Sequence, residues 1–340
     1  MKTRRILGMA MAILVIVTGA AWAGSEERLG TGGASELRLP VGARAIAMGG
    51  ASLGSVSGAE ALFYNPAGAA ATDSPTEVMF SHTQYIADMD VNYFGVTQSM
   101  GALGVLGLSA KVLSIGDIPF TNEAAPDGTG EIFSPTFATM GLTYAKRMTD
   151  RVNFGGTLSY ISERILQETA AGAAFDFGFQ YDTGYQGMKL GMAMKNFGPN
   201  LEFNGSDFDR NLLLPGDDPQ SGSRTVSSGS ARFEMPSYFQ LGLSYPVVQG
   251  ANSLTLHGIY QSSSFGQDEG CVGGEWMYRR DAALRLGYRY NSSDDFLYGL
   301  SYGAGLRVPL GTANLWVDYA GQTVSDFFDD IQHLALSIVF

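Results

Sequence analysis

Residues 175–182 read FDFGFQYD, and the strict alternation in this stretch decides the predicted fold. Successive side chains of a β-strand point to opposite faces. One face of this strand would carry only aromatic residues: Phe175, Phe177, Phe179 and Tyr181. The other face would be polar and partly bare: Asp176, Gly178, Gln180 and Asp182. An apolar outer face and a polar inner face are typical of transmembrane barrel strands. A soluble sandwich also alternates, but its polar face is rarely so rich in glycine.

The same pattern recurs along most of the chain after residue 76. Between residues 188 and 195 the predicted outer face carries Met188, Leu190, Met192 and Met194. Runs of this kind predict about fourteen strands. Short links mostly alternate with longer ones between these strands, as periplasmic turns alternate with extracellular loops in outer-membrane barrels. The predicted fold class is therefore all-β, a transmembrane outer-membrane β-barrel of about 14 antiparallel strands.

An early stretch shows no such alternation. Residues 33–68 read GASELRLPVGARAIAMGGASLGSVSGAEALFYNPAG, rich in glycine and alanine and poor in charge. Pro40 suits the first turn of a helix, because its missing N–H is not needed there. A second helix is predicted from Ser57 as N-cap, with Glu60 completing a capping box, to the Asn65-Pro66 pair. We predict that this stretch folds back into the lumen as a small helical plug.

The early stretch also carries a family resemblance. LPVGARAIAMGGA at 39–51, followed by EALFYNPAG at 60–68, resembles the N-terminal signature of the PorV/PorQ family of outer-membrane proteins. TNEAAPDGTGEIFS at 121–134 is similar to an early loop of the same family. The Asn65-Pro66-Ala67 turn resembles one in the wider FadL-like group of long-chain fatty acid transporters and hydrophobic-compound channels.

The two resemblances imply different functions. The PorV/PorQ resemblance implies an accessory or shuttle component of protein secretion, of the type IX kind, whose partners are secreted cargo proteins and secretion components. The FadL resemblance implies a passive channel for hydrophobic small molecules, in which the plug acts as a gate. A mainly structural barrel is the third alternative.

The N-terminus predicts the compartment. Lys2, Arg4 and Arg5 precede an apolar run, and Ala21-Trp22-Ala23 offers a small-x-small cleavage site. These features are typical of a secretory signal peptide. An uncleaved anchor is the alternative, but the run is short for one. The predicted segments are a signal peptide at 1–23, the plug at 24–76 and the barrel at 77–340.

Composition excludes several classes. Charged residues make up only 16%, and a mean hydropathy of +0.03 is too low for a helical membrane protein. Loss of three of the 21 basic residues with the signal leaves 18 against 33 acidic ones, and this net charge of −15 argues against nucleic-acid binding. Cys271 is the only cysteine, so no internal disulfide can form.

No spacing of residues predicts catalysis or metal binding. His82, His257 and His333 fall in different predicted strands without the spacing of metal ligands. A Ser–His pair at His257 or His333 is conceivable in the lumen, but no spacing supports it. We therefore predict that the protein is not an enzyme and takes no cofactor and no metal.

Several predicted strands point charge inward, where a wet lumen avoids the roughly 2–4 kcal/mol cost of Lys or Arg in lipid. We predict plug and lumen contacts at Arg44, Asn65, Pro66, Asp176, Glu275, Arg285, Arg289 and Asp318. Arg44 is expected to pair with Asp176, Asp318 or Glu275. Glu275 is expected to lie diagonal to Arg285 and Arg289 across a hairpin. If the barrel is a channel, an apolar pocket is expected at Phe63, Tyr64, Ile259 and Trp316.

The outer surface and the chain end predict further partners. The apolar face would contact outer-membrane lipid and lipopolysaccharide, and divalent ions are conceivable bridges to acidic loops such as Asp217-Asp218 and Asp294-Asp295. The terminal Phe340 resembles the aromatic signal that the barrel-assembly machinery reads, although an ordinary terminal phenylalanine is the alternative. The predicted location is the outer membrane of the cell.

Overall fold

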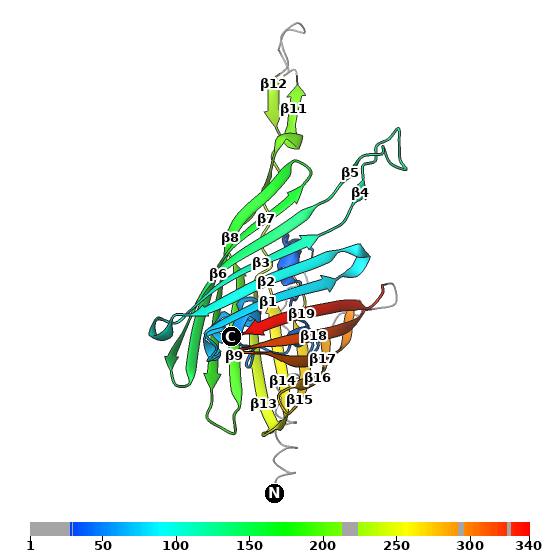
Figure 1. The fold of residues 1–340 in the computed structure, drawn as a ribbon. Coiled ribbons are helices and arrows are strands. Elements are labelled where there is room, and N and C mark those ends of the chain that lie inside the picture. Colours follow the sequence, from blue (N-terminus) through cyan, green and yellow to red (C-terminus); the bar gives the residue numbers. More distant parts are fainter. Residues whose placement is uncertain (1–27, 29, 213–223, 292–295, 325–327) are drawn as a thin grey trace.

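The computed structural model describes residues 28, 30–212, 224–291, 296–324 and 328–340. Long antiparallel strands form a closed barrel in which each strand pairs with the next, and β1 pairs with the last strand to close the ring (Figure 1). The fourteen wall strands are β1 (Thr76–Gln84), β2 (Asp90–Ser99), β3 (Val105–Ser114), β6 (Thr136–Thr149), β7 (Val152–Ile165), β8 (Glu168–Asp182), β9 (Lys189–Phe197), β13 (Tyr238–Val248), β14 (Asn252–Ser263), β15 (Glu269–Tyr278), β16 (Ala282–Asn291), β17 (Tyr298–Leu310), β18 (Ala313–Val324) and β19 (Ile331–Val339). The predicted fold class is confirmed.

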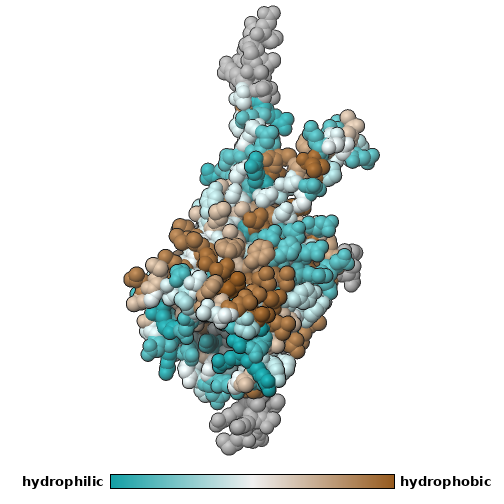
Figure 2. All heavy atoms as spheres, viewed as in Figure 1, coloured by the Kyte–Doolittle hydropathy of each residue, from teal (hydrophilic) through white to brown (hydrophobic). Residues whose placement is uncertain are grey.

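The wall is oily outside and polar inside, as the alternation predicts. On β8 the outward Phe175 and Phe179 are 45% and 41% exposed, whereas the inward Asp176 and Gln180 are 4% and 5% exposed. Figure 2 shows hydrophobic residues gathered across the middle of the barrel, with hydrophilic residues above and below them. A band of this kind matches the hydrocarbon layer of a membrane, so the protein is an outer-membrane barrel.

The longer connections leave the barrel at one end. One carries the small hairpin β4 (Ile118–Pro119) and β5 (Ile132–Phe133), and the segment 121–134 runs from the turn of this hairpin through β5 (Figure 1). Another carries β10 (Phe203–Asn204), η6 (Ser206–Phe208), β11 (Asp209–Leu212) and β12 (Arg224–Ser227). Because long loops face outward in such barrels, this end is extracellular and the end with short turns is periplasmic.

Short helical turns complete the wall connections: η4 (Ile86–Asp88) links β1 to β2, and η5 (Gly101–Leu103) links β2 to β3. Among the described residues no helix has the length and apolar character needed to cross a membrane. The predicted signal peptide and the acidic pairs at 217–218 and 294–295 lie outside the described residues.

The segment before β1 lies inside the barrel. It consists of η2 (Ser35–Arg38), α2 (Ala43–Ile46), α3 (Gly58–Tyr64) and η3 (Pro66–Ala71). The first predicted helix begins later than the sequence suggests, at Ala43 rather than Pro40. Gly42 has a φ of 80°, outside the helical region, so the chain through Pro40 and Val41 does not join the helix.

The predicted capping box at α3 is wrong. Ser57 is the N-cap residue but its side chain caps nothing, and the Glu60 carboxylate instead accepts a hydrogen bond from the Ala45 N–H at 3.0 Å. The carboxylate of Glu77 on β1 lies at the start of the helix instead, since a Cβ built on Gly58 would lie 1.8 Å from Glu77 Oε2. A tertiary contact has replaced the local one.

The plug packs closely against the wall at positions where the wall residue is glycine. Among the described residues, nine wall glycines face the lumen against plug atoms, and we call them the lumenal glycines: Gly95, Gly107, Gly155, Gly178, Gly191, Gly242, Gly273, Gly287 and Gly303. A Cβ built on Gly287 would lie 2.1 Å from the carbonyl carbon of Met48, a distance that real atoms do not reach. Plug backbone therefore lies directly against wall backbone.

Candidate functional site

Asn65 fastens the plug to the wall. Its side chain is fully buried, and Nδ2 donates to the carbonyls of Leu53 at 3.1 Å and Phe179 at 3.0 Å. Its Oδ1 accepts a hydrogen bond from the Ala67 N–H at 3.2 Å, directly after Pro66. One side chain thus joins two turns of the plug to the backbone of β8.

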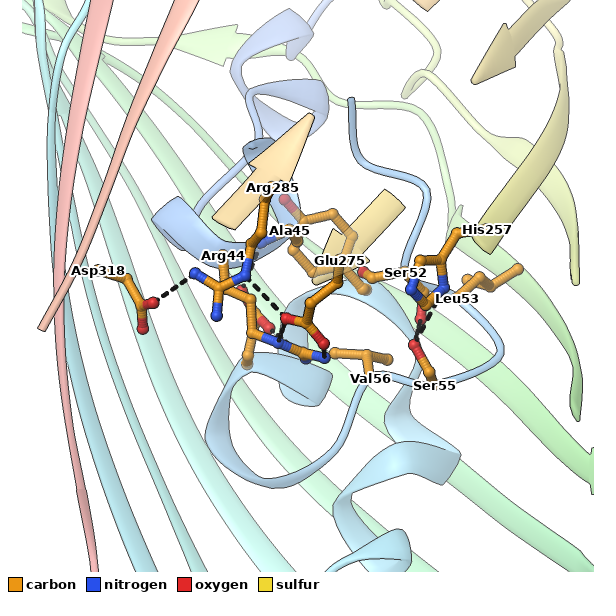
Figure 3. Close-up of polar contacts among 12 residues, drawn as sticks. Arg44, Ala45, Ser52, Leu53, Ser55, Val56, His257, Glu275, Arg285 and Asp318 are labelled. Atoms are coloured by element: carbon orange, nitrogen blue, oxygen red, sulfur yellow. Dashed lines mark hydrogen bonds and ion pairs between the residues drawn. The ribbon is translucent and has the colours of Figure 1, made fainter. Parts of the chain in front are cut away.

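Five charged residues form an inner ion network beneath the plug: Arg44, Glu60, Glu275, Arg285 and Asp318 (Figure 3). Arg285 Nε lies 2.7 Å from Glu275 Oε2, and Arg285 Nη1 lies 2.5 Å from Asp318 Oδ1. Arg44 binds the same Glu275 at 3.0 Å and 3.1 Å and lies 3.4 Å from Glu60. The plug arginine is thereby tied to β15.

The register corrects two expectations about this network. Glu275 stands directly opposite Arg285 rather than diagonal to it. Arg289 does not reach Glu275, because it stands opposite Cys271 and binds Glu269 at 2.7 Å instead. Glu269 also binds Arg38 of the plug at 2.6 Å, so these three residues form a separate outer ion network.

Asp176 belongs to neither the inner nor the outer ion network, and it does not pair with Arg44 as the sequence suggests. Its carboxylate lies 2.8 Å from Lys195 Nζ and accepts the Asn196 N–H at 2.7 Å. Asn196 has a φ of 58°, and the β8–β9 register shifts beside it, between Phe175 and Phe177. The carboxylate therefore holds a kink in β9.

A cavity of about 420 Å³ lies between the plug and the wall toward the extracellular end, and we call it the outer chamber. Its apolar lining residues include Leu39, Phe63, Leu113, Ile115, Phe137 and Ile259. Its polar lining residues include Arg38, Tyr64, Gln240, Gln261, Glu269 and Arg289. Three of the four predicted pocket residues, Phe63, Tyr64 and Ile259, line this chamber.

The first described residues of the plug close one side of the chamber. Residues 30–40, which we call the strap, run across the lumen from the segment before β13 to β3. At one end the Gly33 N–H donates to the Glu234 carbonyl at 3.0 Å. At the other end Lys111 Nζ donates to the Glu36 carbonyl at 2.8 Å. Polar bonds near the mouth thus hold the strap.

Trp316 lies apart from the outer chamber. It lines a separate cavity of about 280 Å³ on the periplasmic side, the inner vestibule, together with Arg44, Glu77, Arg285 and Asp318. β18 starts at a periplasmic turn, and Trp316 is only its fourth residue, so its ring cannot reach the extracellular half. A buried apolar cluster between the two cavities includes Val41, Ala43, Ile46 and Ala59.

Two plug carboxyl groups are perturbed by burial. Removal from water raises the pKa of Glu60, and the Arg44 guanidinium opposes this shift. Burial likewise raises the pKa of Glu36, whose two buried carboxylate oxygens have no hydrogen-bond partner among the described residues. Both groups therefore hold their protons more firmly than an exposed glutamate does.

The histidines form no catalytic or metal centre in the part of the chain that the structure describes. His257 Nδ1 lies 3.4 Å from Ser55 Oγ (Figure 3) and 2.9 Å from Ser244 Oγ. His333 Nδ1 lies 2.8 Å from Thr83 Oγ1. A hydrolytic triad needs a carboxylate on the second ring nitrogen, and Nε2 of His257 has no hydrogen-bond partner among the described residues. The described residues contain no cluster of His, Cys, Asp and Glu suited to a metal ion.

Sequence reasoning missed several residues that shape the lumen. Glu77 and Glu269 sit at strand starts, where a charge is expected to be solvated. Lys111 binds backbone carbonyls of the plug, and no sequence pattern marks such a partner. The sequence offers one indication of the kink at Asn196, because asparagine tolerates a positive φ better than most residues.

A closed wall, an apolar belt and a lumen filled by the leading segment define a plugged outer-membrane β-barrel. The sequence matches no protein-family model and no curated protein. Its structure resembles the Pseudomonas putida toluene transporter TodX, with 12% identity, a TM-score of 0.59, and coverage of 88% of this chain and 97% of that one. It also resembles a Pseudomonas aeruginosa FadL homologue, with 14% identity, a TM-score of 0.54, and coverage of 89% and 98%. The fold is that of the FadL-like outer-membrane barrels.

Proposed function

We propose that this protein lets small hydrophobic compounds cross the outer membrane, with the outer chamber as their binding site. The observation that carries the proposal is the chamber itself. A volume of about 420 Å³ falls within the range of small-molecule sites, and part of the lining consists of aliphatic and aromatic residues. An apolar compound gains free energy there by leaving water.

The route inward from the chamber favours a sideways exit. The buried plug cluster lies below, and the inner vestibule beyond it is lined by charged residues that an apolar compound cannot solvate. Phe63 lines both the chamber and a small cavity of about 40 Å³ that reaches the β9 kink at Asn196. We infer that the compound leaves through the wall at this kink into the membrane.

The solved barrels of the same fold point in the same direction, since one is described as a toluene transporter and another as a FadL homologue. The secretion role that the PorV/PorQ resemblance implies stays a prediction without such support. The segment 121–134 belongs to the exposed β4–β5 hairpin, which is compatible with either role.

The test is uptake of radiolabelled toluene by cells that make the protein, compared with cells that do not. Ile115→Trp fills the outer chamber and is expected to lower uptake severalfold. Ile132→Trp is the matched control, because Ile132 lies in the same extracellular connection, is 63% exposed and does not line the chamber.

Equal uptake by both variants would contradict the proposal. Failure of the wild-type protein to raise toluene uptake above empty cells would contradict it as well. Co-purification of secreted proteins with a barrel that takes up no toluene would instead favour the secretion role.

A further inference from the structure

Phe63 is the one described residue that borders both cavities between the strap and the kink in β9. Its side chain, on α3, lines the outer chamber and also the cavity of about 40 Å³ that reaches Asn196. None of the other described residues that line the small cavity lines the chamber as well. The Phe63 ring is therefore the partition between the two spaces.

The partition is closed in this structure. An engineered apolar cavity that holds one benzene molecule has a volume of about 150 Å³. The small cavity, at about 40 Å³, has room for water but not for an aromatic ring. A compound of the size of toluene can therefore pass toward the kink only when the Phe63 ring moves.

Two ammonium groups and two tyrosine rings hold the Phe63 ring in place. Lys111 Nζ and Lys195 Nζ each lie 4.9 Å from the ring centroid, within the range of cation–π attraction. The rings of Tyr64 and Tyr93 meet it edge to face, with centroid distances of 5.0 Å and 6.5 Å. Each contact is modest by itself, so together they fix a resting position from which the ring can still be displaced.

The same two lysines connect the partition to both ends of the route. Lys195 also donates to the Phe63 carbonyl and lies 2.8 Å from Asp176. The Asp176 carboxylate in turn accepts the N–H of Asn196 at the kink. Lys111 donates to backbone carbonyls of the strap. The partition is thus tied to the strap at the mouth and to the kink at the exit.

We propose that Phe63 limits the size of the compounds that leave the outer chamber toward the kink. The inference rests on the proposed function and adds the residue that selects among apolar compounds. A wider compound needs a larger displacement of a ring that four side chains hold in place. A single-ring compound such as toluene is therefore favoured over a fused two-ring compound such as naphthalene.

The test is uptake of radiolabelled toluene and naphthalene by cells that make Phe63→Ala or Phe137→Ala. Phe137, on β6, lines the outer chamber but not the small cavity, so both changes remove the same side chain from the chamber. Only Phe63→Ala removes the partition. We expect its ratio of naphthalene to toluene uptake to rise severalfold above the ratio of the matched control Phe137→Ala.

Phe63→Trp tests the opposite direction and guards against a folding defect in Phe63→Ala. Its indole is larger than a phenyl ring and attracts ammonium groups more strongly, so the partition stays closed. Toluene uptake is expected to fall severalfold, while equilibrium dialysis of the purified barrel still detects toluene bound in the chamber. Semi-native gels show whether each variant is folded.

Equal ratios of naphthalene to toluene uptake in the two alanine variants, with toluene uptake by the wild type, would overturn this inference and leave the proposed function standing. Loss of toluene binding together with uptake in folded Phe63→Trp would also overturn it, because Phe63 would then only shape the chamber. Absence of toluene uptake by the wild type would overturn the proposed function, and this inference with it.

Discussion

The side chain of Asn65 occupies the space that Gly178 leaves free on the inner face of β8. A Cβ built on Gly178 would lie 2.0 Å from Asn65 Oδ1 and 2.9 Å from Pro66 Cδ. The contact joins the most recognisable turn of the plug to one glycine of the wall. A single methyl group on that glycine is therefore enough to displace the turn.

Gly178→Ala is expected to loosen the plug and to destabilise the protein by about 1–3 kcal/mol, the usual effect of overpacking. The loosened plug will be cut faster by an added protease at the turn after α3. Gly156→Ala is the control, because Gly156 stands on the neighbouring strand but faces lipid. Equal protease resistance of the two variants would count against direct plug–wall contact.

Arg285→Met is expected to be the most damaging single change in the inner ion network. The Arg285 side chain is 1% exposed, and its loss leaves Glu275 and Asp318 buried with less compensation. Breaking a buried pair costs about 3–5 kcal/mol. The measurement is the temperature at which the folded band is lost on a semi-native gel.

Arg307→Met is the control for that experiment. Arg307 binds Asp281 at the periplasmic edge with 34% of its side chain exposed, and exposed pairs contribute about 0–1 kcal/mol. If the two variants lose the folded band at the same temperature, the inner ion network does not stabilise the barrel.

Glu36→Gln is expected to change the pH dependence of stability. Because the folded protein holds the Glu36 proton more tightly than the unfolded chain, this contribution is full below the ordinary pKa of 4.5 and is lost as pH rises through the raised value. Glutamine has nearly the same shape as protonated glutamic acid and stays uncharged at every pH. The variant should therefore match the wild type at about pH 4 and exceed its thermal stability at about pH 8.

The same semi-native gels, run at the two pH values, measure this difference. Glu131→Gln is the control, since Glu131 is exposed on the extracellular hairpin. A Glu36→Gln variant that is less stable than the wild type at the higher pH would show that the carboxylate is charged and needed in the folded state.

Glu269→Gln is expected to alter the preference of the outer chamber between anionic and neutral aromatic compounds. Glu269 Oε1 and Oε2 each bind one arginine, Arg38 and Arg289, at 2.6 Å and 2.7 Å. Removal of this negative charge leaves two cations beside the apolar lining of the chamber. The ratio of benzoate to toluene binding should rise severalfold, measured by equilibrium dialysis of the purified barrel. Glu234→Gln, which affects only the exposed pair with Arg28, should leave the ratio unchanged.

The alternation of residues such as Phe177 and Asp176 predicts the wall, because period two is imposed by strand geometry wherever one face meets lipid and the other water. It also predicts that Arg285 and Asp318 face the lumen. It does not say which partner each charge takes, because the stagger between strands is a property of the closed ring. Arg289 shows this, since it binds Glu269 rather than Glu275.

The plug was harder to predict than the wall. Ser57 and Glu60 have the spacing of a capping box, yet both ends of that box found tertiary partners or none. The wall decides the local structure here, because the carboxylate of Glu77 on β1 lies against Gly58, the first residue of α3. The prediction that Trp316 lines the same pocket as Phe63 does not hold for a related reason. The depth of Trp316 in the barrel depends on where β18 begins.

The two cavities have opposite character, with an oily outer chamber above the buried plug cluster and a charged vestibule below it. A water-soluble molecule that enters the chamber meets the buried apolar cluster, whereas an apolar compound that leaves sideways does not enter the charged vestibule. Under the proposed function, a bacterium with many copies of such a barrel admits apolar nutrients without opening an aqueous path through its envelope.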